Sequence, residues 1–558
     1  MAKKRNREQR KRTKQNSLIV YLVLLVLAFS FRVAVARFLP NDAPDDGKVY
    51  AQIARNVLEQ HVYSNEAEAP YAPTLIRLPG YPLLVAGVYA IFGHGDNQAV
   101  RVVQALIDTG TCGLIALLAF LWEPDERRKR PTAIAALALA AVCPFTTIYV
   151  ATILTEIPTM FLATAMCVTA TLALKAPGGR RTLWLWLATG AIAGLAVLFR
   201  PDSGLFACAI GITLVVATLA RPSGLQLARK RDEKLYRLAH TSYHGAVFSL
   251  AFCLVLVPWA IRNYRVFHLF QPLAPAHAEM PGEFVPRGYL RWVRTWIDEG
   301  RYVGPALWSL DTTAIKLTDY PERAFDSAEE KQRVGKLLEQ YNNPNQEPQL
   351  FVDQVQPTPE ASPDEAADTK NDEDDNEADS DDQEDDSQAD DGDSGTPDSD
   401  QAVEMTPQID AGFAQLAQER IAHHPLRYYV LLPLKRAHAL WFNTHSDYYP
   451  FEGELLPIDD LDYAGGQQYW LPLFAFLVLA YSVLGIGGGW FLWEAGNFSS
   501  RLWLLLAALM VFLRIGFFAT LENPEPRYVV EAFPFLSALG GIAVVRIKYL
   551  LEDRLRKR

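Results

Sequence analysis

Ten charged side chains stand close to the ends of long apolar blocks, and their types suit chemistry on a polar substrate. Carboxylates can accept or donate a proton, and arginines can hold a phosphate group with paired hydrogen bonds. Taken singly, each is more simply interpreted as a solvated charge at a helix end. The ten are Asp45, Asp46, Glu156, Arg200, Asp202, Arg262, Glu522, Glu525, Arg527 and Glu531. Whether they can act together depends on the elements that carry them.

The apolar blocks have the length and composition of membrane-spanning helices. Half of the 558 residues are hydrophobic, and a helix of about 20 apolar residues crosses the hydrocarbon core while satisfying its own backbone groups. We therefore expect an all-α polytopic membrane protein with about ten transmembrane helices. The expected spans lie near residues 17–37, 98–122, 131–151, 155–174, 182–199, 204–220, 245–265, 468–491, 500–520 and 528–547.

Positive charge at both ends of the chain predicts the orientation of these spans. Ala2 to Lys14 and Arg546 to Arg558 are rich in Lys and Arg, which are retained on the cytoplasmic side. Both termini should be cytoplasmic, so the ten charged residues gather at the outer face. The predicted organisation is a basic tail 1–16, a transmembrane module 17–265, an extracytoplasmic loop 266–467, a transmembrane module 468–547 and a basic tail 548–558.

Two outer segments are expected to be soluble or interfacial. The first, 38–97, should carry surface helices, because apolar residues recur at helical spacing from Val49 to Gln60. Two short apolar stretches, 79–93 and 426–442, are interpreted as interfacial or re-entrant pieces.

The second outer segment contains an acidic tract, 355–408, of low sequence complexity. Residues 360–400 alone carry a net charge of −19, so the rest of the chain carries +8. Such a composition predicts a disordered linker, with weak ion binding as the alternative. The tract lacks the ligand spacing of a calcium loop. All five cysteines lie in apolar blocks, and no zinc-binding spacing is present, so no metal site is assigned.

Two further charges, Asp108 and Arg514, lie inside expected spans. Ionisable residues in a membrane are candidates for function, although each could instead be a buried structural partner. Glu531 would pair with Arg514 if the ninth and tenth helices pack side by side.

Several short strings occur in an order that resembles a known enzyme family. They are Asp45 to Tyr50 followed by Ile53-Ala54, Arg77 to Leu83, Phe92-Gly93, Val100 to Gln104, Thr155-Glu156, Gly194 to Asp202, Pro258 to Tyr264, and Pro526 to Tyr528 with Pro534. Together they are similar to the C-type polyprenyl-phosphate-dependent glycosyltransferases. The bacterial branch related to protein O-mannosyltransferases and aminoarabinose transferases is the most similar, and the resemblance runs through most of the chain outside the acidic tract.

The resemblance implies a helical-bundle enzyme that uses a polyprenyl-phosphate sugar as donor, inverts the anomeric centre and has an aspartate base in the first outer loop. The step of four residues to Tyr50 selects Asp46. Because the family often has Glu after the aspartate, the pair found here leaves Asp45 as a competitor. The candidates for binding the donor phosphate are Arg527, Arg262, Arg200 and Arg514, and further site candidates are Tyr50, Glu156, Asp202 and Glu531.

One carboxylate base is enough for this reaction, because a phosphate leaves without a paired general acid. Positive charge is needed where the phosphate gains negative charge. The expected partners are a membrane lipid carrier and an acceptor that could be a protein, lipid or glycan, and no nucleic acid. The expected location is the bacterial inner membrane, with the site facing the periplasm or exterior. Cofactors, a divalent metal and the kind of sugar stay open.

A transporter or flippase for a lipid-linked or anionic substrate is the main alternative, and a scaffold for envelope assembly is a third. Transporters are often built from repeated halves with broken helices. The sequence shows no convincing internal repeat, which favours the enzyme.

Overall fold

The computed structural model of the chain is helical, as expected. Its described part consists of residues 2–39, 45–220, 230–275, 277–343, 403–443, 455–456, 458 and 466–556. Within these ranges the only extended pairing is an isolated bridge between Leu455 and Ile458. The acidic tract lies outside the described residues up to residue 402.

The structure confirms a polytopic membrane protein. Among the described residues, nine helices are long and apolar enough to cross a membrane, or ten if one bent pair is a single span. The bundle is made of α1 (Ala2–Phe38), α4 (Asn97–Trp122), α5 (Lys129–Ala141), α6 (Pro144–Thr147), α7 (Glu156–Lys175), α8 (Arg180–Phe199), α9 (Gly204–Leu219), α10 (Lys230–Phe267), α15 (Gln467–Glu494), α16 (Phe498–Phe518) and α17 (Phe533–Arg556).

The bent pair occupies the place of the third span, which we expected at 131–151. The chain turns by 54° between Lys129–Ala141 and Pro144–Ala151, where Pro144 begins α6. A proline cannot continue the preceding helix but fits the first turn of a new one. The basic terminal segments continue the first and last spans as helix, because α1 starts at Ala2 and α17 runs to Arg556.

Small residues allow close approach of the spans. A Cβ atom added to Gly190 of α8 would lie 2.2 Å from the Phe248 carbonyl oxygen of α10, and one added to Gly488 of α15 would lie 2.0 Å from the Leu539 carbonyl oxygen of α17. Backbones this close pack well in lipid, where the contact between helices depends on dispersion.

A buried ion pair joins α1 to α4. Arg32 Nε lies 2.6 Å from Asp108 Oδ2, and both side chains are almost fully buried. The remaining guanidinium N–H groups donate to the carbonyl oxygens of Ala28, Ala140 and Ala141 and to Cys112 Sγ. All three nitrogen atoms of the Arg32 guanidinium group therefore have hydrogen-bond partners within the bundle. We interpret Asp108 as the structural partner of Arg32.

Beside the bundle, the first outer loop forms α2 (Asp45–Glu59) and α3 (Gly80–Phe92), as expected for surface helices. The large loop forms a separate outer domain from α11 (Arg287–Val293), α12 (Ala328–Asn342) and α13 (Pro407–His423). Short turns also belong to it: η3 (Gly300–Tyr302), η4 (Gly304–Trp308), η5 (Leu317–Asp319) and η6 (Glu322–Ala324). Trp292, Trp296 and Phe413 lie in its own hydrophobic core. The last residues of the expected linker belong to this domain, since Met405 is buried and α13 starts at Pro407.

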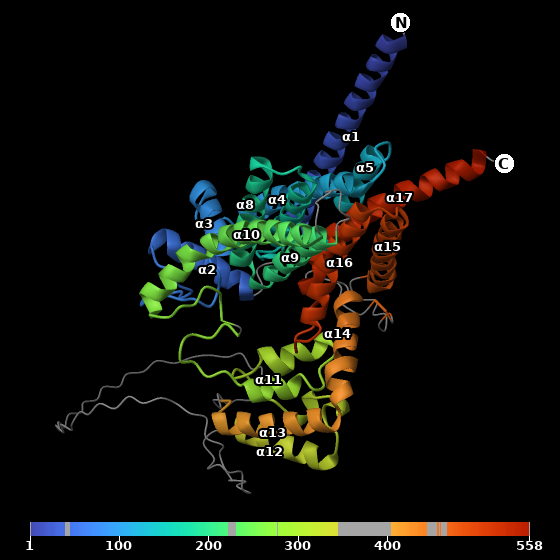
Figure 1. Cartoon of the computed structure of the whole chain (residues 1–558). Coiled ribbons are helices and arrows are strands. Elements are labelled where there is room, and N and C mark those ends of the chain that lie inside the picture. The colour runs from blue at the N-terminus through green and yellow to red at the C-terminus, as the bar shows by residue number, and fades with distance from the viewer. Residues whose placement is uncertain are drawn as a thin grey trace, which may run out of the picture.

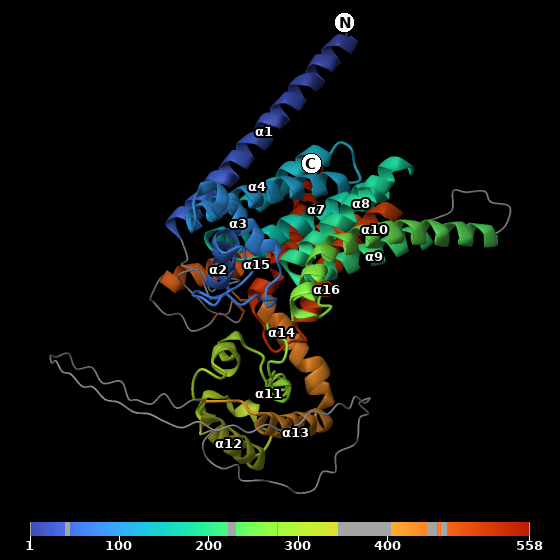
Figure 2. The same cartoon turned by 90° about the vertical axis from the view of Figure 1, so that its left-hand side faces the viewer.

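The outer domain lies on one side of the bundle, and both chain ends lie toward the opposite side (Figures 1 and 2). The stretch 426–442 forms η7 (Arg427–Leu431) and α14 (Leu432–Trp441). In Figure 1, α14 runs between the outer domain and the bundle. The exposed Leu431 and Leu434 side chains of this stretch are compatible with the interfacial position that we expected. Arg436 fixes α14 by donating to the carbonyl oxygens of Ile297 and Arg294.

Candidate functional site

Asp46 lies between two arginines in the first turn of α2. Its Oδ1 atom accepts from Arg77 Nη2 at 2.8 Å, and its Oδ2 atom accepts from Arg527 Nη2 at 3.3 Å. Burial by itself would raise the pKa of Asp46, but the Arg527 and Arg77 charges hold it below the ordinary value. The carboxylate is therefore ionised at neutral pH. The side chain of Asp45 lies outside the described part of the structure.

Arg77 comes to this position because α3 begins against the end of α8. A Cβ atom at Gly80 would lie 2.6 Å from the Phe199 ring and 2.7 Å from the Leu198 carbonyl oxygen. Only glycine permits this contact without a shift of the backbone. The Pro79-Gly80 step thus places Arg77, three residues earlier, beside the turn that follows α8.

Arg527 belongs to η9 (Pro526–Ala532), a 3-10 segment that leads into α17. Pro526 is its first residue, a position that tolerates a missing N–H group. Arg527 also pairs with Glu525. The next residue, Tyr528, stacks on Phe518 with 4.6 Å between ring centroids, and its hydroxyl accepts from Asn523. These contacts fix the segment at the outer end of α16.

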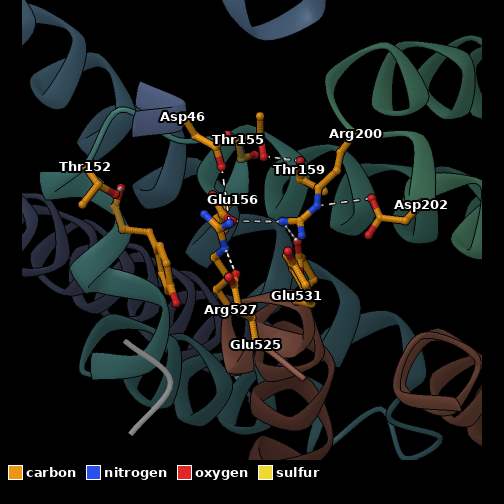
Figure 3. Close-up of polar contacts among 12 residues, drawn as sticks. Asp46, Thr152, Thr155, Glu156, Thr159, Arg200, Asp202, Glu525, Arg527 and Glu531 are labelled. Atoms are coloured by element: carbon orange, nitrogen blue, oxygen red, sulfur yellow. Dashed lines mark hydrogen bonds and ion pairs between the residues drawn. The ribbon is translucent and has the colours of Figure 1, made fainter. Parts of the chain in front are cut away.

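Close to Asp46 lies a buried network of five charges. Figure 3 labels four of them: Glu156, Arg200, Asp202 and Glu531. Arg200 Nη1 lies 3.0 Å from Glu156 Oε1 and 3.4 Å from Glu531 Oε1, and its Nε lies 3.2 Å from Asp202 Oδ1. Arg514 Nη2 lies 2.6 Å from Asp202 Oδ2 and 3.0 Å from Glu531 Oε1. The expected Arg514–Glu531 contact is present, although α16 and α17 are joined here through η9.

Local sequence explains why Arg200 reaches this network. α8 ends at Phe199, and Arg200 has an extended backbone with φ −155°, as expected for a residue that precedes proline. Glu156 is the first residue of α7, where the helix dipole favours a negative charge. Three carboxylates surround the Arg200 guanidinium group, so its charge is already balanced within the protein.

A cavity of about 530 Å³ opens in front of these residues. It is lined by five of the predicted site residues: Asp46, Tyr50, Glu156, Arg200 and Arg527. The Tyr50 ring packs edge-on against Tyr81 with 5.1 Å between centroids. Burial, with the nearby Asp46 charge, raises the pKa of Tyr50 to about 12, so its hydroxyl stays protonated. Asp202, Arg514 and Glu531 lie behind the wall of the cavity, in the network described above.

Arg262, the remaining predicted residue, does not line this cavity. It donates to the carbonyl oxygens of Thr74 at 2.8 Å and Tyr63 at 3.4 Å. Its guanidinium group lies over the rings of Tyr63, Trp259 and Phe267 at 5.0 to 5.4 Å. These contacts connect the first outer loop to α10, which indicates a structural role for Arg262.

Sequence reasoning did not assign several residues of the cavity wall: Arg77, Thr155, His277 and Trp308. Arg77 belongs to one of the sequence strings that resemble the family, so its positive charge could have marked it as a candidate for phosphate binding. His277 and Trp308 come from the large loop and reach the cavity only through tertiary packing. Among the described residues, no group of three or more His, Cys, Asp and Glu side chains is arranged to hold a metal ion.

Comparison with known proteins agrees with the sequence strings. Residues 73–229 match the family model described as dolichyl-phosphate-mannose-protein mannosyltransferase. The expected resemblance to the C-type glycosyltransferases is thereby confirmed. The matched range includes Arg77, Glu156, Arg200 and Asp202 and ends before Arg527. No curated protein matches the chain.

Two kinds of solved structure are similar to the chain over most of its length. The oligosaccharyltransferase AglB from Archaeoglobus fulgidus, in complex with an inhibitory peptide and a dolichol-phosphate, is 14% identical, with a TM-score of 0.48 over 96% of this chain and 51% of that one. ArnT from Cupriavidus metallidurans, bound to undecaprenyl phosphate, is 13% identical, with a TM-score of 0.35 over 94% and 78%. The chain thus spans about half the length of the oligosaccharyltransferase. With both scores below 0.5, the site is interpreted from its own residues.

Proposed function

We propose that this protein transfers a sugar from a polyprenyl-phosphate donor to an acceptor hydroxyl at the extracytoplasmic face of the bacterial inner membrane, with inversion. The observation that carries the proposal is the position of Asp46, held by Arg77 and Arg527 on the wall of a 530 Å³ cavity. One ionised carboxylate and two guanidinium groups match the needs of the reaction, which are a base and a site for a phosphate.

In the proposed reaction, the acceptor oxygen attacks the anomeric carbon from the side opposite the phosphate. The new carbon–oxygen bond forms as the bond to the phosphate oxygen breaks, and the acceptor proton passes to Asp46. The polyprenyl phosphate leaves with the bonding electron pair. Arg527 and Arg77 stabilise the charge that develops on the phosphate.

The arginines have a second consequence for the base. While they pair with Asp46, they make it a weak proton acceptor, because each positive charge favours the ionised form. A donor phosphate would compete for the same guanidinium groups. Binding of the donor thus raises the basicity of Asp46 at the time when a proton has to be accepted.

Arg200 and Arg514 are less suited to hold the phosphate than the sequence alone suggested. Arg200 contacts three carboxylates. Arg514 contacts two of the same three and, unlike Arg527, does not line the cavity. We propose that this network holds three elements in place around the cavity: α7, the turn after α8, and η9. The proposed site for the donor phosphate near Asp46 then consists of Arg77 and Arg527.

Incubation of the purified protein with a panel of polyprenyl-phosphate hexoses and pentoses tests the proposal. Release of the carrier phosphate, with the sugar transferred to an acceptor, is the expected result. The transporter alternative predicts movement of the intact lipid across vesicles without release. The absence of release with every donor, in the presence of membrane extracts that supply acceptors and metal ions, would contradict the proposed enzyme.

The proposed topology has its own test in intact cells. Cysteines introduced at Asn41 and Gln388 should react with a membrane-impermeant thiol reagent, and those at Arg128 and Lys230 should not. Labelling at Arg128 would place the cavity on the opposite face.

A further inference from the structure

Part of the cavity wall comes from the large outer loop and includes Trp308. The carboxylate and guanidinium groups of the cavity come from other elements: Asp46 from α2, Arg77 from the segment before α3, Glu156 from α7, Arg200 from the turn after α8, and Arg527 from η9. The outer domain thus supplies an aromatic surface to a site whose charges belong to the bundle and the first outer loop.

Trp308 differs from the other tryptophans of its domain. Its side chain is 60% exposed, whereas Trp292 and Trp296 are 0% and 2% exposed in the domain core. An exposed large apolar side chain beside a cavity often marks a binding surface. Trp308 also lies among polar groups, since the same cavity contains His277, Arg77 and Asp46.

The turn that carries Trp308 is firmly attached to the domain. Val303 and Ala306 are buried within η4 and at its start. The hydroxyl of Tyr289 donates to the Ala306 carbonyl oxygen at 2.7 Å, and the Ser309 N–H group donates to Gly304 at 3.1 Å. The backbone is therefore anchored on the core while the Trp308 indole projects out of it. An anchored platform loses little conformational freedom when a ligand binds.

We propose that Trp308 is a sugar-binding platform for the donor, packing its indole face against the C–H face of the pyranose ring. The proposal rests on the proposed function. A sugar ring has polar hydroxyl edges and apolar C–H faces, and an indole is a broad, rigid apolar surface. With the phosphate held by Arg77 and Arg527, the attached sugar occupies the remaining space of the same cavity, in front of Asp46. Trp308 then sets the orientation of the anomeric carbon.

The test compares Trp308→Leu and Trp308→Phe with Trp184→Leu as a matched control. Trp184, in α8, is 67% exposed and does not line the cavity. Trp308→Leu should raise the donor KM about tenfold, the size expected for loss of one aromatic contact. Trp308→Phe should keep most of the affinity, and Trp184→Leu should match the wild type. Equal thermal unfolding midpoints in detergent exclude a folding defect.

A second ligand separates the sugar from the lipid. Bare polyprenyl phosphate, used as a competitive inhibitor, should bind Trp308→Leu as well as it binds the wild type. An unchanged donor KM, an equal loss of affinity for the bare carrier, or a rise confined to the acceptor KM would overturn the proposal. If the wild type turns over no donor, the proposed function fails. In that case equal binding of sugar-bearing and bare carriers by the wild type would overturn the platform as well.

Discussion

The guanidinium group of Arg294, the residue that follows α11, donates through both Nε and Nη2 to one carboxylate oxygen of Glu522, with Nε at 2.8 Å. Glu522 lies in the short connection between α16 and η9, three residues before Glu525, which pairs with Arg527. The outer domain is thus bonded to the segment that carries a proposed phosphate-binding arginine. This contact makes the position of the domain relevant to the site.

We expect the Arg294–Glu522 ion pair to position Arg527. Glu522→Gln should lower kcat more than it affects the donor KM, and the charge exchange Arg294→Glu with Glu522→Arg should restore part of the loss. A double-mutant cycle should give a coupling of about 1 kcal/mol. The control is Glu419→Gln, which breaks the exposed Arg333–Glu419 pair of the same domain. Purely additive losses in the cycle would show that the two side chains act separately.

Arg32 and Asp108 provide a prediction about stability. Removing one partner of a buried ion pair leaves an uncompensated charge, which costs about 3 to 5 kcal/mol. Asp108→Ala should therefore strongly lower the unfolding temperature in detergent, whereas the joint replacement Arg32→Met with Asp108→Leu should recover much of it. Activity should follow the folded fraction in each variant. An inactive Asp108→Ala with an unchanged unfolding temperature would instead indicate a direct role in the reaction.

The acidic tract should be dispensable for turnover. The structure supports its excision, because the Glu404 N–H group donates to the Tyr341 carbonyl oxygen at 3.4 Å. The two ends of the insertion are therefore close together on the outer domain. Deletion of residues 360–400 should leave kcat within about threefold, as expected for a solvated charged insertion. A loss as large as that of a site variant would show that the tract takes part in catalysis.

The sequence allowed the bundle and much of the site to be predicted, for physical reasons. Length and hydropathy are strong signals for spans, and the charges at one end of each span had to meet if the spans formed a bundle. Asp46, Tyr50, Glu156, Arg200 and Arg527 do line one cavity. The helix bend before Pro144 was missed because the apolar pattern continues through it.

Apart from the Arg514–Glu531 contact, the pairing of charges was not predicted from the sequence. Arg262 and Arg200 have the same residue type and a similar place beside a span, yet aromatic rings surround one and carboxylates surround the other. Arg32 was not singled out, although it is the partner of Asp108. Such partners are far apart in the chain, and only the packing of helices decides which of them meet.

Arg527 should be more sensitive to loss of charge than to loss of shape. Arg527→Lys keeps a positive charge without the two-pronged geometry, so it should retain more activity than Arg527→Ala, for which a loss on the order of 10²-fold is expected. Inhibition by bare polyprenyl phosphate should weaken in the same order. Arg301→Ala, at an exposed position of the outer domain, is the control. Wild-type kinetics in both Arg527 variants would move the phosphate site to Arg77.

Asp46 is predicted to be the base, and its pH dependence follows from its partners. Its pKa is held below the ordinary value by Arg527 and Arg77, against the opposing effect of burial. A depressed pKa keeps the carboxylate ionised throughout the neutral range, so kcat/KM should not fall through Asp46 until the pH drops below the usual range of aspartate. Arg77→Gln removes one of the two charges, so it should move this acid limb to higher pH.

Substitution separates this role from helix capping, since Asp46 lies in the first turn of α2. Asn caps a helix about as well as Asp but cannot accept the proton. Asp46→Asn should therefore leave folding nearly unchanged and should not weaken binding of bare polyprenyl phosphate, while lowering kcat by on the order of 10²-fold or more. A capping role predicts that Asn is tolerated and that Ala costs about 1 kcal/mol of stability. Asp45→Asn is the control. An inactive Asp45→Asn variant together with an active Asp46→Asn variant would show that Asp45 is the base.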